Sequence, residues 1–368
     1  MKHRRNEIVL LITLWGYSNF GNRLQAIALK HMIEQCGYDV QCVPNVSNSQ
    51  IKYRLKGYIA RLLGFIGVKR IRGRYLKETR AKSLRHSSDR ILKPYTKKAV
   101  SFDMTTIKST DYYAAVTGSD QVWHKWSKND NELDFFYLSF MPQCKRISYA
   151  ASFGFDEVPE SDKNKHIAGL KGMSSISCRE RSGCELVRSL VNRDSELVLD
   201  PTLCVGTEYW QRLESAPHYK TPDRYLFLMM LGDSSEMLDK VKECASRESL
   251  EIIDIMDKNN KAIWSTSIGE FLWLIHHAQI VFTDSFHCTV FSILFARRFC
   301  VYRRRGAGFE KMFNRIETLL NTLGLSENEC NGYDSSSVHE RLESQSRLSQ
   351  EWLSNALAKA KEKDDQSA

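Results

Sequence analysis

The sequence predicts an α/β protein of two Rossmann-like domains, whose parallel sheets face a cleft, followed by a C-terminal helix. Short apolar runs alternate with longer amphipathic stretches along the chain, which is typical of parallel sheets built from βαβ units. A polar stretch with Pro217 and Pro222 interrupts this alternation over 206–224. The length of 368 residues is also enough for two cores. We therefore expect an N-terminal domain over 1–205, a C-terminal domain over 225–330 and a helix over 338–363.

The expected N-terminal domain begins with a buried strand, because Ile8–Trp15 is almost entirely apolar. In Asn22–Cys36 the apolar residues recur on one helical face instead. The basic region 51–100 is expected to be a helical insert. The remaining expected elements are the strands Val40–Val43, Tyr113–Thr117, Arg146–Ser152, Ser174–Cys178 and Glu196–Leu199, and the helix Arg179–Leu190.

The expected C-terminal domain repeats the same alternation. Its expected strands are Tyr225–Leu231, Leu250–Met256, Gln279–Thr283 and Phe299–Tyr302, and its helices are Ser234–Arg247, Ile268–Ala278, His287–Ala296 and Phe309–Leu323. Ligands of such sheets bind beyond the carboxyl ends of the strands. Polar residues that directly follow strands are therefore the candidates for chemistry.

Composition excludes several classes of protein. A hydrophobic fraction of 42% excludes a disordered chain, and no apolar run reaches the roughly 18–20 residues of a membrane-spanning helix. The basic start Met1–Arg5 before Ile8–Trp15 imitates a signal peptide, but no small-residue cleavage site follows. The ten cysteines form no C-x-x-C pair, so we expect reduced core cysteines and neither zinc ligands nor disulfides. These features predict a cytoplasmic protein.

Positive charge is concentrated in the region 51–100, which holds 16 Lys and Arg against two acidic residues. With a net charge of +9 for the whole chain, the remainder is about −5. The apolar residues Ile59, Leu62, Phe65 and Ile66 lie within this region. Two interpretations stay open: a solvated helix packed on the core, or peripheral contact with an anionic membrane at the inner face of the plasma membrane. No nucleic-acid motif accompanies the charge, and no His, Asp and Glu cluster has metal-ligand spacing.

Two polar loops follow expected strands of the first domain. The segment Asn19–Gln25 opens a helix, whose free amides can bind an anion or a sugar hydroxyl. It lacks the G-x-G-x-x-G spacing of a dinucleotide site. The segment Gly118–Trp123 offers polar groups for hydroxyls and an indole ring for a sugar face. The alternative for Asp120 is a helix cap.

Two other strand ends carry ionisable side chains. Arg179 follows Ser174–Cys178, and its planar guanidinium suits a carboxylate or a phosphate, unless it forms a salt bridge to Glu180. His287 falls in the first turn after Gln279–Thr283, where it can act as a general acid or base with Asp284 to orient it. A Ser-His-Asp triad is excluded, because the three residue types lie within four positions and no G-x-S-x-G elbow exists.

A cluster of arginines follows the last expected strand. Arg303, Arg304 and Arg305 come directly after Phe299–Tyr302, and Arg315 lies in the next expected helix. Such a cluster suits a multiply charged anion. At most two of these side chains can point into a cleft, and we expect the others to face solvent.

In this order, the motifs resemble the polysaccharide pyruvyl transferase family. The matching segments are Asn19–Gln25, Gly118–Trp123, Ile147–Gly154, Ser177–Glu180, Asp200–Leu203 and Asp284–Cys288. The resemblance spans roughly residues 8–325, and the family is similar in fold to GT-B glycosyltransferases. Two positions depart from the family pattern: Cys288 replaces the usual Gly, and Ser285 stands where some members have an arginine that binds the donor. Another cation must then supply that charge.

The resemblance implies transfer of pyruvate from phosphoenolpyruvate to a sugar, commonly galactose, with release of phosphate and formation of a ketal. The acceptor would belong to a bacterial exopolysaccharide or capsule, or to its lipid-linked precursor, and no further cofactor is implied. The N-terminal domain would hold the acceptor and the C-terminal domain the donor. The implied residues are His287 and Asp284 for catalysis; Arg179, Ser285, Arg303, Arg304, Arg305 and Arg315 for the donor; and Asn19, Asn22, Gln25, Ser119, Asp120, Gln121 and Trp123 for the acceptor. A GT-B glycosyltransferase that uses a nucleotide sugar and a non-catalytic glycan-binding protein remain alternatives.

Overall fold

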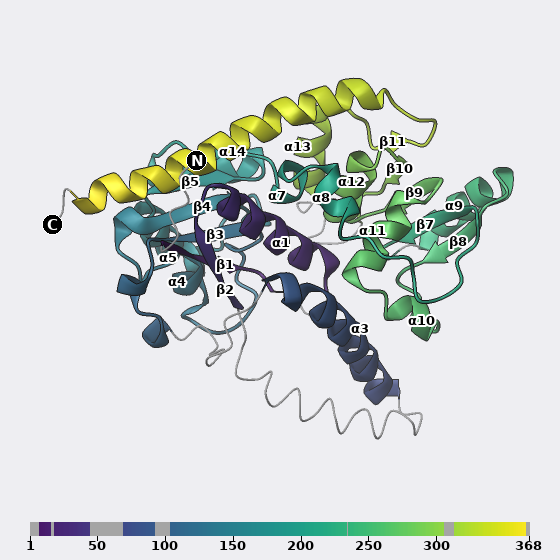
Figure 1. The fold of residues 1–368 in the computed structure, drawn as a ribbon, viewed down its shortest axis with the longest axis horizontal. Coiled ribbons are helices and arrows are strands. Elements are labelled where there is room, and N and C mark those ends of the chain that lie inside the picture. Colours follow the sequence, from purple (N-terminus) through teal and green to yellow (C-terminus); the bar gives the residue numbers. More distant parts are fainter. Residues whose placement is uncertain are drawn as a thin grey trace.

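The computed structural model describes residues 7–15, 18–44, 69–92, 104–233, 235–304 and 313–365, which form two sheets (Figure 1). The first sheet has six strands in the order β2-β1-β3-β4-β5-β6, and the second has five in the order β11-β10-β9-β7-β8. Neighbouring strands are parallel except β10 and β11. The predicted α/β class, with two parallel sheets and a long C-terminal helix, is confirmed.

The helices and strands have the following bounds. The first half contains β1 (Ile8–Thr13), α1 (Phe20–Gln35), β2 (Asp39–Pro44), α3 (Lys69–Leu92), β3 (Ala114–Asp120), α4 (Glu132–Phe136), β4 (Arg146–Ala151), α5 (Glu160–Lys171), β5 (Ser175–Cys178), α6 (Arg181–Val191), β6 (Glu196–Leu197), α7 (Pro201–Cys204) and α8 (Thr207–Gln211). The second contains β7 (Tyr225–Met229), α9 (Ser235–Arg247), β8 (Glu251–Asp254), α10 (Lys261–Trp264), α11 (Ile268–His276), β9 (Ile280–Thr283), α12 (Phe286–Leu294), β10 (Arg298–Val301), α13 (Asn314–Leu323), β11 (Asn328–Glu329) and α14 (Ser335–Asp365).

The order of the strands reverses once in each sheet. In the first sheet, β2 lies on one side of β1 and β3 lies on the other. In the second sheet, β8 and β9 flank β7 in the same way. Loops that leave opposite sides of the sheet diverge at such a point, and the crevice between them is where ligands of α/β sheets bind. Asp120 ends β3 and Asp284 follows β9, so two of the sequence motifs lie at these reversals.

Helix α1 lies between the two sheets and helps to join them (Figure 1). The ring of Phe20, at the start of α1, stacks on Phe271 of α11 with centroids 4.3 Å apart. One continuous apolar cluster contains residues from both sheets. Helix α14 crosses back over the first half, where Ser349 Oγ accepts a hydrogen bond from the backbone N of Leu199. The two sheets are therefore joined by a common apolar core as well as by the chain that links them.

The structure differs from the sequence prediction in several elements. The sequence analysis did not predict the helices α4, α5 and α10. Helix α8 occupies part of the polar stretch that was expected to link the domains. Trp210 anchors α8 in the core, where it is fully buried. The antiparallel strand β11 was missed because two residues carry no readable period.

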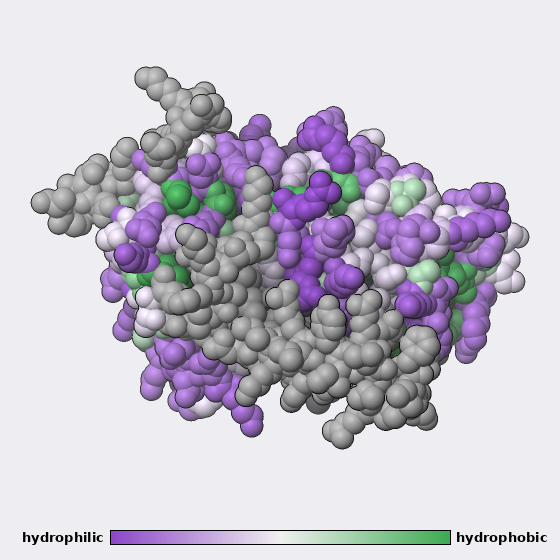
Figure 2. Space-filling model, turned by 60° about the horizontal axis from the view of Figure 1, so that its bottom comes forward, coloured by the Kyte–Doolittle hydropathy of each residue, from purple (hydrophilic) through white to green (hydrophobic). Residues whose placement is uncertain are grey.

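The basic insert is helical where it is described, as α3. The apolar residues Ile59, Leu62, Phe65 and Ile66 lie outside the described residues. On the face drawn in Figure 2, the coloured residues are mainly hydrophilic, and the hydrophobic ones form small separate patches. Within the described part of the chain, no helix combines the length and apolar character needed to cross a membrane.

Candidate active site

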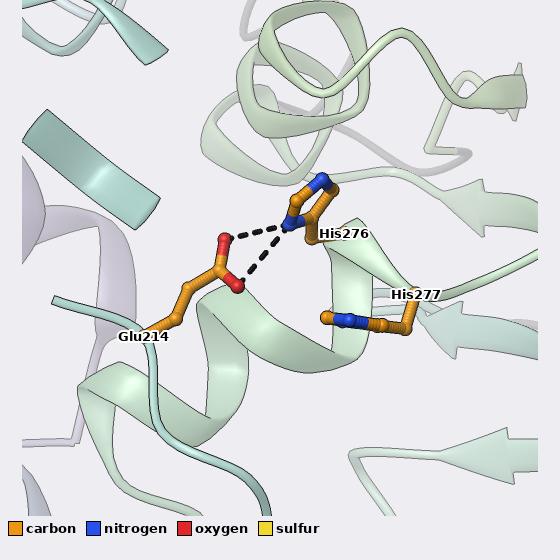
Figure 3. A group of neighbouring side chains, drawn as sticks. All are labelled: Glu214, His276 and His277. Carbon is orange, nitrogen blue, oxygen red and sulfur yellow. Dashed lines mark hydrogen bonds and ion pairs between the residues drawn. The ribbon is translucent and has the colours of Figure 1, made fainter. Parts of the chain in front are cut away.

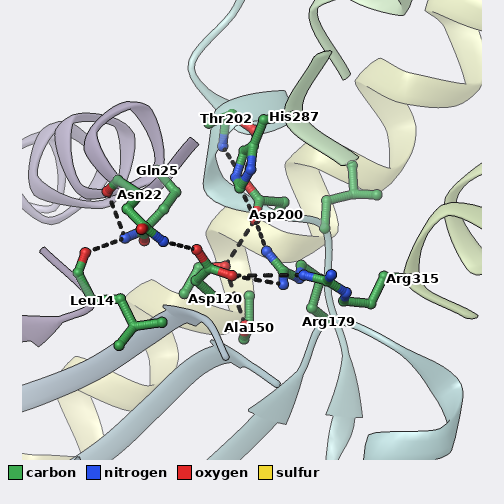
Figure 4. Close-up of polar contacts among 12 residues, drawn as sticks. Leu14, Asn22, Gln25, Asp120, Ala150, Arg179, Asp200, Thr202, His287 and Arg315 are labelled. Atoms are coloured by element: carbon green, nitrogen blue, oxygen red, sulfur yellow. Dashed lines mark hydrogen bonds and ion pairs between the residues drawn. The ribbon is translucent and has the colours of Figure 1, made fainter. Parts of the chain in front are cut away.

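Buried charged side chains from both halves meet beyond the carboxyl ends of β3 and β5 (Figure 4). Arg179 directly follows β5 and is only 4% exposed. Its Nη1 donates to Asp200 Oδ2 over 2.8 Å, and its Nη2 donates to Asp120 Oδ1 over 3.2 Å. Burial alone would lower the pKa of Arg179, but Asp120, Asp200 and Glu180 together raise it. The guanidinium is therefore permanently charged and fixed in direction.

Asp200 is the central acceptor of this group and is 1% exposed. It caps the N-terminus of α7: its Oδ1 accepts from the backbone N of Thr202 over 3.0 Å and from its hydroxyl over 2.6 Å. Its Oδ2 accepts from Arg179 and from Ser119 Oγ, the latter over 2.9 Å. Burial raises the pKa of Asp200, but His287, Arg179 and Thr202 outweigh it, and the pKa lies below its usual value.

His287 enters the site from the first turn of α12 in the second half of the chain. Its Nε2 lies 3.7 Å from Asp200 Oδ2, and the residue is 7% exposed. Burial lowers the pKa of His287, while Asp200 and Asp120 act in the opposite direction without cancelling the effect. The imidazole is therefore neutral at pH 7, as a proton acceptor must be.

Asp120 lies opposite, at the end of β3, with a left-handed backbone (φ 73°) that turns its carboxylate toward the cluster. Asn22 Nδ2 donates a hydrogen bond to its Oδ2, and Arg315 Nη1 lies 3.7 Å from its Oδ1. Burial raises the pKa of Asp120, but Arg179, His287 and Arg315 lower it to about 2. Asp120 is thus a charged acceptor that joins the start of α1 to the arginines.

A pocket of about 40 Å³ opens beside the two arginines. Burial and the neighbouring charge of Arg179 lower the pKa of Arg315 to about 10, so both side chains are cations at neutral pH. Most of the other lining residues are apolar. Besides Arg179, Asp200 and Arg315, the lining residues are Leu197, Val198, Leu199, Leu203, Phe286, Thr318, Leu319, Thr322 and Gln345. Two cations facing a small, partly apolar pocket suit a small anion with a carbon skeleton.

The remaining residues of the N-terminal motifs have supporting contacts. Asn19 caps α1 by accepting from the backbone N of Asn22 over 3.3 Å. Gln25 is fully buried and donates to Thr13 Oγ1 over 2.7 Å, which ties α1 to β1. Gln121 is 4% exposed. These side chains hold the loops in position, and Asn22 and Asp120 are the ones that meet the charged cluster.

Trp123 does not offer a ring to a sugar, contrary to the prediction. It is fully buried in an apolar cluster, where it stacks on Tyr137 with centroids 5.3 Å apart and packs against Phe153. The loop turns the indole inward after β3, because the core beneath α4 provides the aromatic partners. Its role is therefore packing.

Asp284 does not orient His287, which corrects a second prediction. Its Oδ1 accepts from the backbone N of Leu231, and its Oδ2 accepts from Gly232 N and from Arg304 Nε, each over 2.7–2.8 Å. These bonds use both carboxylate oxygens to fasten the loop after β7. Ser285 is the N-cap residue of α12, and its backbone N donates to the hydroxyl of Thr283 over 3.0 Å.

The C-terminal arginines separate in the structure. Arg303 is exposed, pairs with Glu317 and Glu327 over 3.2 and 2.6 Å, and lies over the ring of Phe313. Arg304 is held by Asp284 as described, and Arg305 lies outside the described residues. Arg315 alone among the predicted C-terminal arginines that the structure describes lines the pocket.

The sequence analysis missed Asp200 as a member of this group. Asp-Pro before a short helix is the ordinary pattern of a helix cap, and Asp200 is such a cap. The only other signal was the D-P-T-L segment within the family pattern. The second carboxylate oxygen, which meets Arg179 and His287, could not be inferred from that pattern.

A group of possible metal ligands, Glu214, His276 and His277, also comes together (Figure 3). Their candidate atoms lie within 4.8 Å of one another. His276 Nδ1 pairs with Glu214 Oε1 over 2.9 Å, and His277 Nδ1 is hydrogen-bonded to the carbonyl of Trp273 over 2.9 Å. These contacts account for the group as a hydrogen-bonded pair next to the ring of His277, which stacks on Trp273, and we assign it no metal.

Several solved structures resemble the chain. A UDP-GlcNAc 2-epimerase from Neisseria meningitidis is 9% identical, with a TM-score of 0.44 over 94% of this chain and 99% of that one. The epimerase from Methanocaldococcus jannaschii is 10% identical, with a TM-score of 0.44 over 91% and 98%. MurG from Acinetobacter baumannii is 10% identical, with a TM-score of 0.39 over 97% and 95%.

No curated protein sequence matches the chain. The pattern of a protein family does match, and it covers residues 19–305. This range starts at the N-cap of α1 and extends past Arg304, so it contains Asp120, Arg179, Asp200 and His287. The family is described as polysaccharide pyruvyl transferase. The chain belongs to the polysaccharide pyruvyl transferase family of enzymes.

Proposed function

We propose that this enzyme transfers pyruvate from phosphoenolpyruvate to two hydroxyls of one sugar in a surface polysaccharide or its lipid-linked precursor. The observation that carries the proposal is that His287, a neutral buried imidazole, and the cation Arg179 lie at the same carboxylate oxygen of Asp200, while Arg179, Asp200 and Arg315 line one pocket. An enol phosphate that carries a carboxylate needs both kinds of group: cations for its anionic ends and a residue that moves protons.

The reaction balances without a further cofactor. In the first addition, one hydroxyl oxygen bonds to the carbon that carries the phosphate and loses its proton, while the methylene carbon gains a proton and becomes methyl. In the second step, the bond from that carbon to the phosphate oxygen breaks, and the second hydroxyl takes its place and loses its proton. The products are a pyruvate ketal and hydrogen phosphate.

We assign the proton transfers at oxygen to His287. A neutral imidazole can accept the proton of an attacking hydroxyl, and Asp200 and Asp120 stabilise the imidazolium that results. Asp200 is a positioning residue in this scheme, because it contacts His287 and Arg179 with the same oxygen. It thereby sets the distance between the proton-transfer group and a cation for the donor.

We assign Arg179 and Arg315 to the donor and the start of α1 to the acceptor. Arg315 takes the place of the arginine that some family members have where this chain has Ser285. On the opposite side, Asn22 and Asp120 offer an amide and a carboxylate, which are the usual partners of sugar hydroxyls. Gln121 extends the same loop. The donor would then lie toward α13 and the acceptor toward α1.

The test is to incubate the purified enzyme with phosphoenolpyruvate and a panel of lipid-linked galactosides, and to measure released phosphate and the mass added to each acceptor. Equal release of phosphate and gain of one ketal-linked pyruvate supports the proposal. His287→Gln is expected to abolish both signals, and Arg303→Gln, at an exposed ion pair, serves as the matched control. Thermal stabilisation by UDP-sugars with none by phosphoenolpyruvate would contradict the proposal in favour of a nucleotide-sugar enzyme.

We also propose that the enzyme works in the cytoplasm, at the inner face of the membrane, when its acceptor is lipid-linked. The described part of the basic insert supports a charged surface, because Lys82, His86 and Arg90 are exposed at successive turns of α3. Anionic headgroups attract Lys82 and Arg90 by on the order of 1 kcal/mol each. Salt-sensitive sedimentation with anionic liposomes, reduced in a Lys82→Gln, Arg90→Gln variant, tests it. Binding that is absent at low salt would refute membrane contact and leave the transferase assignment intact.

A further inference from the structure

We propose that Arg80 of the basic insert is a positioning residue, which holds the first turn of α1 against His287. The proposal rests on the transferase function proposed above. It concerns a segment that the family pattern contains but that the sequence motifs do not include. Two sets of contacts carry it, one to the second half of the chain and one to the start of α1.

The first set anchors Arg80 to the second half of the chain. Arg80 is 2% exposed although it belongs to a strongly basic helix. Its Nε donates to the carbonyl of Trp264 over 3.1 Å, its Nη2 donates to the carbonyl of Ile255, and its Cζ lies 3.7 Å from the centroid of the Trp264 ring. Burial lowers the pKa of Arg80 to about 10, so it is buried as a cation.

The second set reaches the active site through one aromatic ring. Arg80 Cζ lies 5.3 Å from the ring centroid of Phe20, the first residue of α1, which is packed against Phe271 on its other side. The next residue is Gly21, whose backbone directly adjoins the imidazole of His287. Asn22, one position further, holds Asp120. The residue that Arg80 touches is therefore covalently joined to two that contact the catalytic cluster.

The contacts at this position require a guanidinium group. Its Cζ lies over the rings of both Trp264 and Phe20 while Nε and Nη2 donate to two carbonyls. A lysine cannot form both contacts, and an apolar side chain would leave two buried carbonyls without those donors. Two other residues of α3 are held on the same neighbours: Trp264 Nε1 donates to the carbonyl of Leu76 over 2.6 Å, and Arg23 of α1 pairs with Asp89 over 2.7 Å.

The described part of the insert, α3, therefore joins the two halves of the chain, and Arg80 is the α3 residue that contacts both Trp264 and Phe20. If Phe20 shifts, Gly21 and Asn22 shift with it. The distance between the His287 imidazole and the Asp120 carboxylate is then no longer fixed. Misplacement of reacting groups by about 1 Å can cost up to a hundredfold in rate. Arg179 and Arg315, which we assign to the donor, belong to other elements, and Arg179 stays held by Asp200 even if Asp120 moves. The expected signature is a fall in kcat with little change in the KM for phosphoenolpyruvate.

The test measures kcat and KM of Arg80→Ala, with and without millimolar guanidinium ion, at a temperature where the variant is folded. We expect kcat to fall roughly tenfold or more, the KM for phosphoenolpyruvate to stay within about twofold, and guanidinium to restore part of kcat. Arg85→Ala is the matched control, because Arg85 lies on the same helix and pairs with Glu78 near the surface. The control is expected to keep kcat and to show no response to guanidinium.

A second variant and a second readout keep the outcome decisive. Phe20→Leu leaves Arg80 its carbonyl partners but removes the ring, and it is expected to lower kcat in the same way. In protein labelled with 13C-histidine, the His287 signal, assigned by its loss in His287→Gln, is expected to move in Arg80→Ala and not in Arg85→Ala. Wild-type kcat in both Arg80→Ala and Phe20→Leu, or an unmoved His287 signal, would overturn the inference. If the wild type transfers no pyruvate but the His287 signal still moves in Arg80→Ala, the proposed function is wrong and the positioning role of Arg80 is supported.

Discussion

Gly21 lies directly against His287. A β-carbon built on Gly21 would come within 2.1 Å of His287 Nδ1 and within 2.8 Å of two ring carbons. No real β-carbon approaches a ring atom so closely, so the first turn of α1 and the first turn of α12 can meet at this distance only because residue 21 has no side chain. The glycine in the N-terminal motif is thus explained by a residue 266 positions later in the chain.

We expect Gly21→Ala to lower kcat by at least tenfold while the protein stays folded. The new methyl group must displace the imidazole from its present position beside Asp200. Alanine in a helix is itself favourable by up to about 1 kcal/mol relative to glycine. Steady-state kinetics together with a thermal melt measure the two effects. Gly172→Ala is the control, because its β-carbon would meet the end of the Arg146 side chain, which can move. Unchanged kcat in Gly21→Ala would mean that the His287 position does not limit the reaction.

The pocket distinguishes Arg315 from Arg303 as the second donor-binding cation. Arg315 lines the pocket beside Arg179, whereas Arg303 is engaged with Glu317 and Glu327 at the surface. We expect Arg315→Gln to raise the KM for phosphoenolpyruvate by roughly tenfold or more, since a charge-assisted hydrogen bond contributes about 1.5–3 kcal/mol. Arg303→Gln is expected to change it less than twofold. The reverse order of effects would reassign the donor site to the surface arginine.

The pH dependence of kcat/KM follows from the lowered pKa of His287. A base must be neutral, so activity is lost as the pH falls through the pKa of His287, and we expect that midpoint below 6.5. Burial is the main cause of the lowering, and the charges of Asp200 and Asp120 oppose it. Asp200→Asn removes one opposing charge and is therefore expected to move the midpoint further down, besides reducing kcat. An upward shift would exclude the proposed proton acceptor. Activity that instead falls as pH rises through the same range would make His287 an acid.

The sequence analysis found most of the site because the carboxyl ends of parallel strands converge. Asp120, Arg179 and His287 were chosen for that position, and the structure brings Arg179 to both Asp120 and Asp200, and His287 to Asp200. The fold class followed from the alternation of apolar runs and amphipathic stretches, but short elements such as α8 and β11 were beyond that signal. The division into domains at 205 and 225 remains a prediction, because the apolar core continues from one sheet to the other.

The errors have a common physical cause. Residue type and position after a strand do not determine which way a side chain turns. Trp123 and Asp284 have the right chemistry in the right loops, yet one turns into an aromatic core and the other is saturated by backbone amides and Arg304. Arg80 is the reverse: the sequence analysis did not select it, yet it is buried and makes specific contacts. Its partners lie 175 and 184 residues away, so a charge in a basic helix gave no indication of a buried contact.

A last prediction concerns the stability of the fold and His166 of α5, which is buried among aromatic side chains. His166 is 1% exposed, its Nδ1 is hydrogen-bonded to Tyr137 Oη over 2.7 Å, and it packs against Phe153. Burial lowers its pKa to about 4, against an opposing effect of Asp162. The unfolded chain binds the proton near pH 6.5 and the folded chain does not, so stability is full above pH 6.5 and falls as the pH drops toward 4.

We expect this histidine to remove roughly 3 kcal/mol of unfolding free energy between pH 6.5 and 4, at 1.36 kcal/mol per unit of pKa difference. His166→Gln keeps a polar partner for Tyr137 but cannot titrate, so its stability is expected to fall less steeply over that range. Urea denaturation at several pH values measures the difference, with His277→Gln, at an exposed histidine, as the control. If His166→Gln and the wild type lose stability in parallel, His166 is protonated within the folded protein and its burial does not oppose the charge.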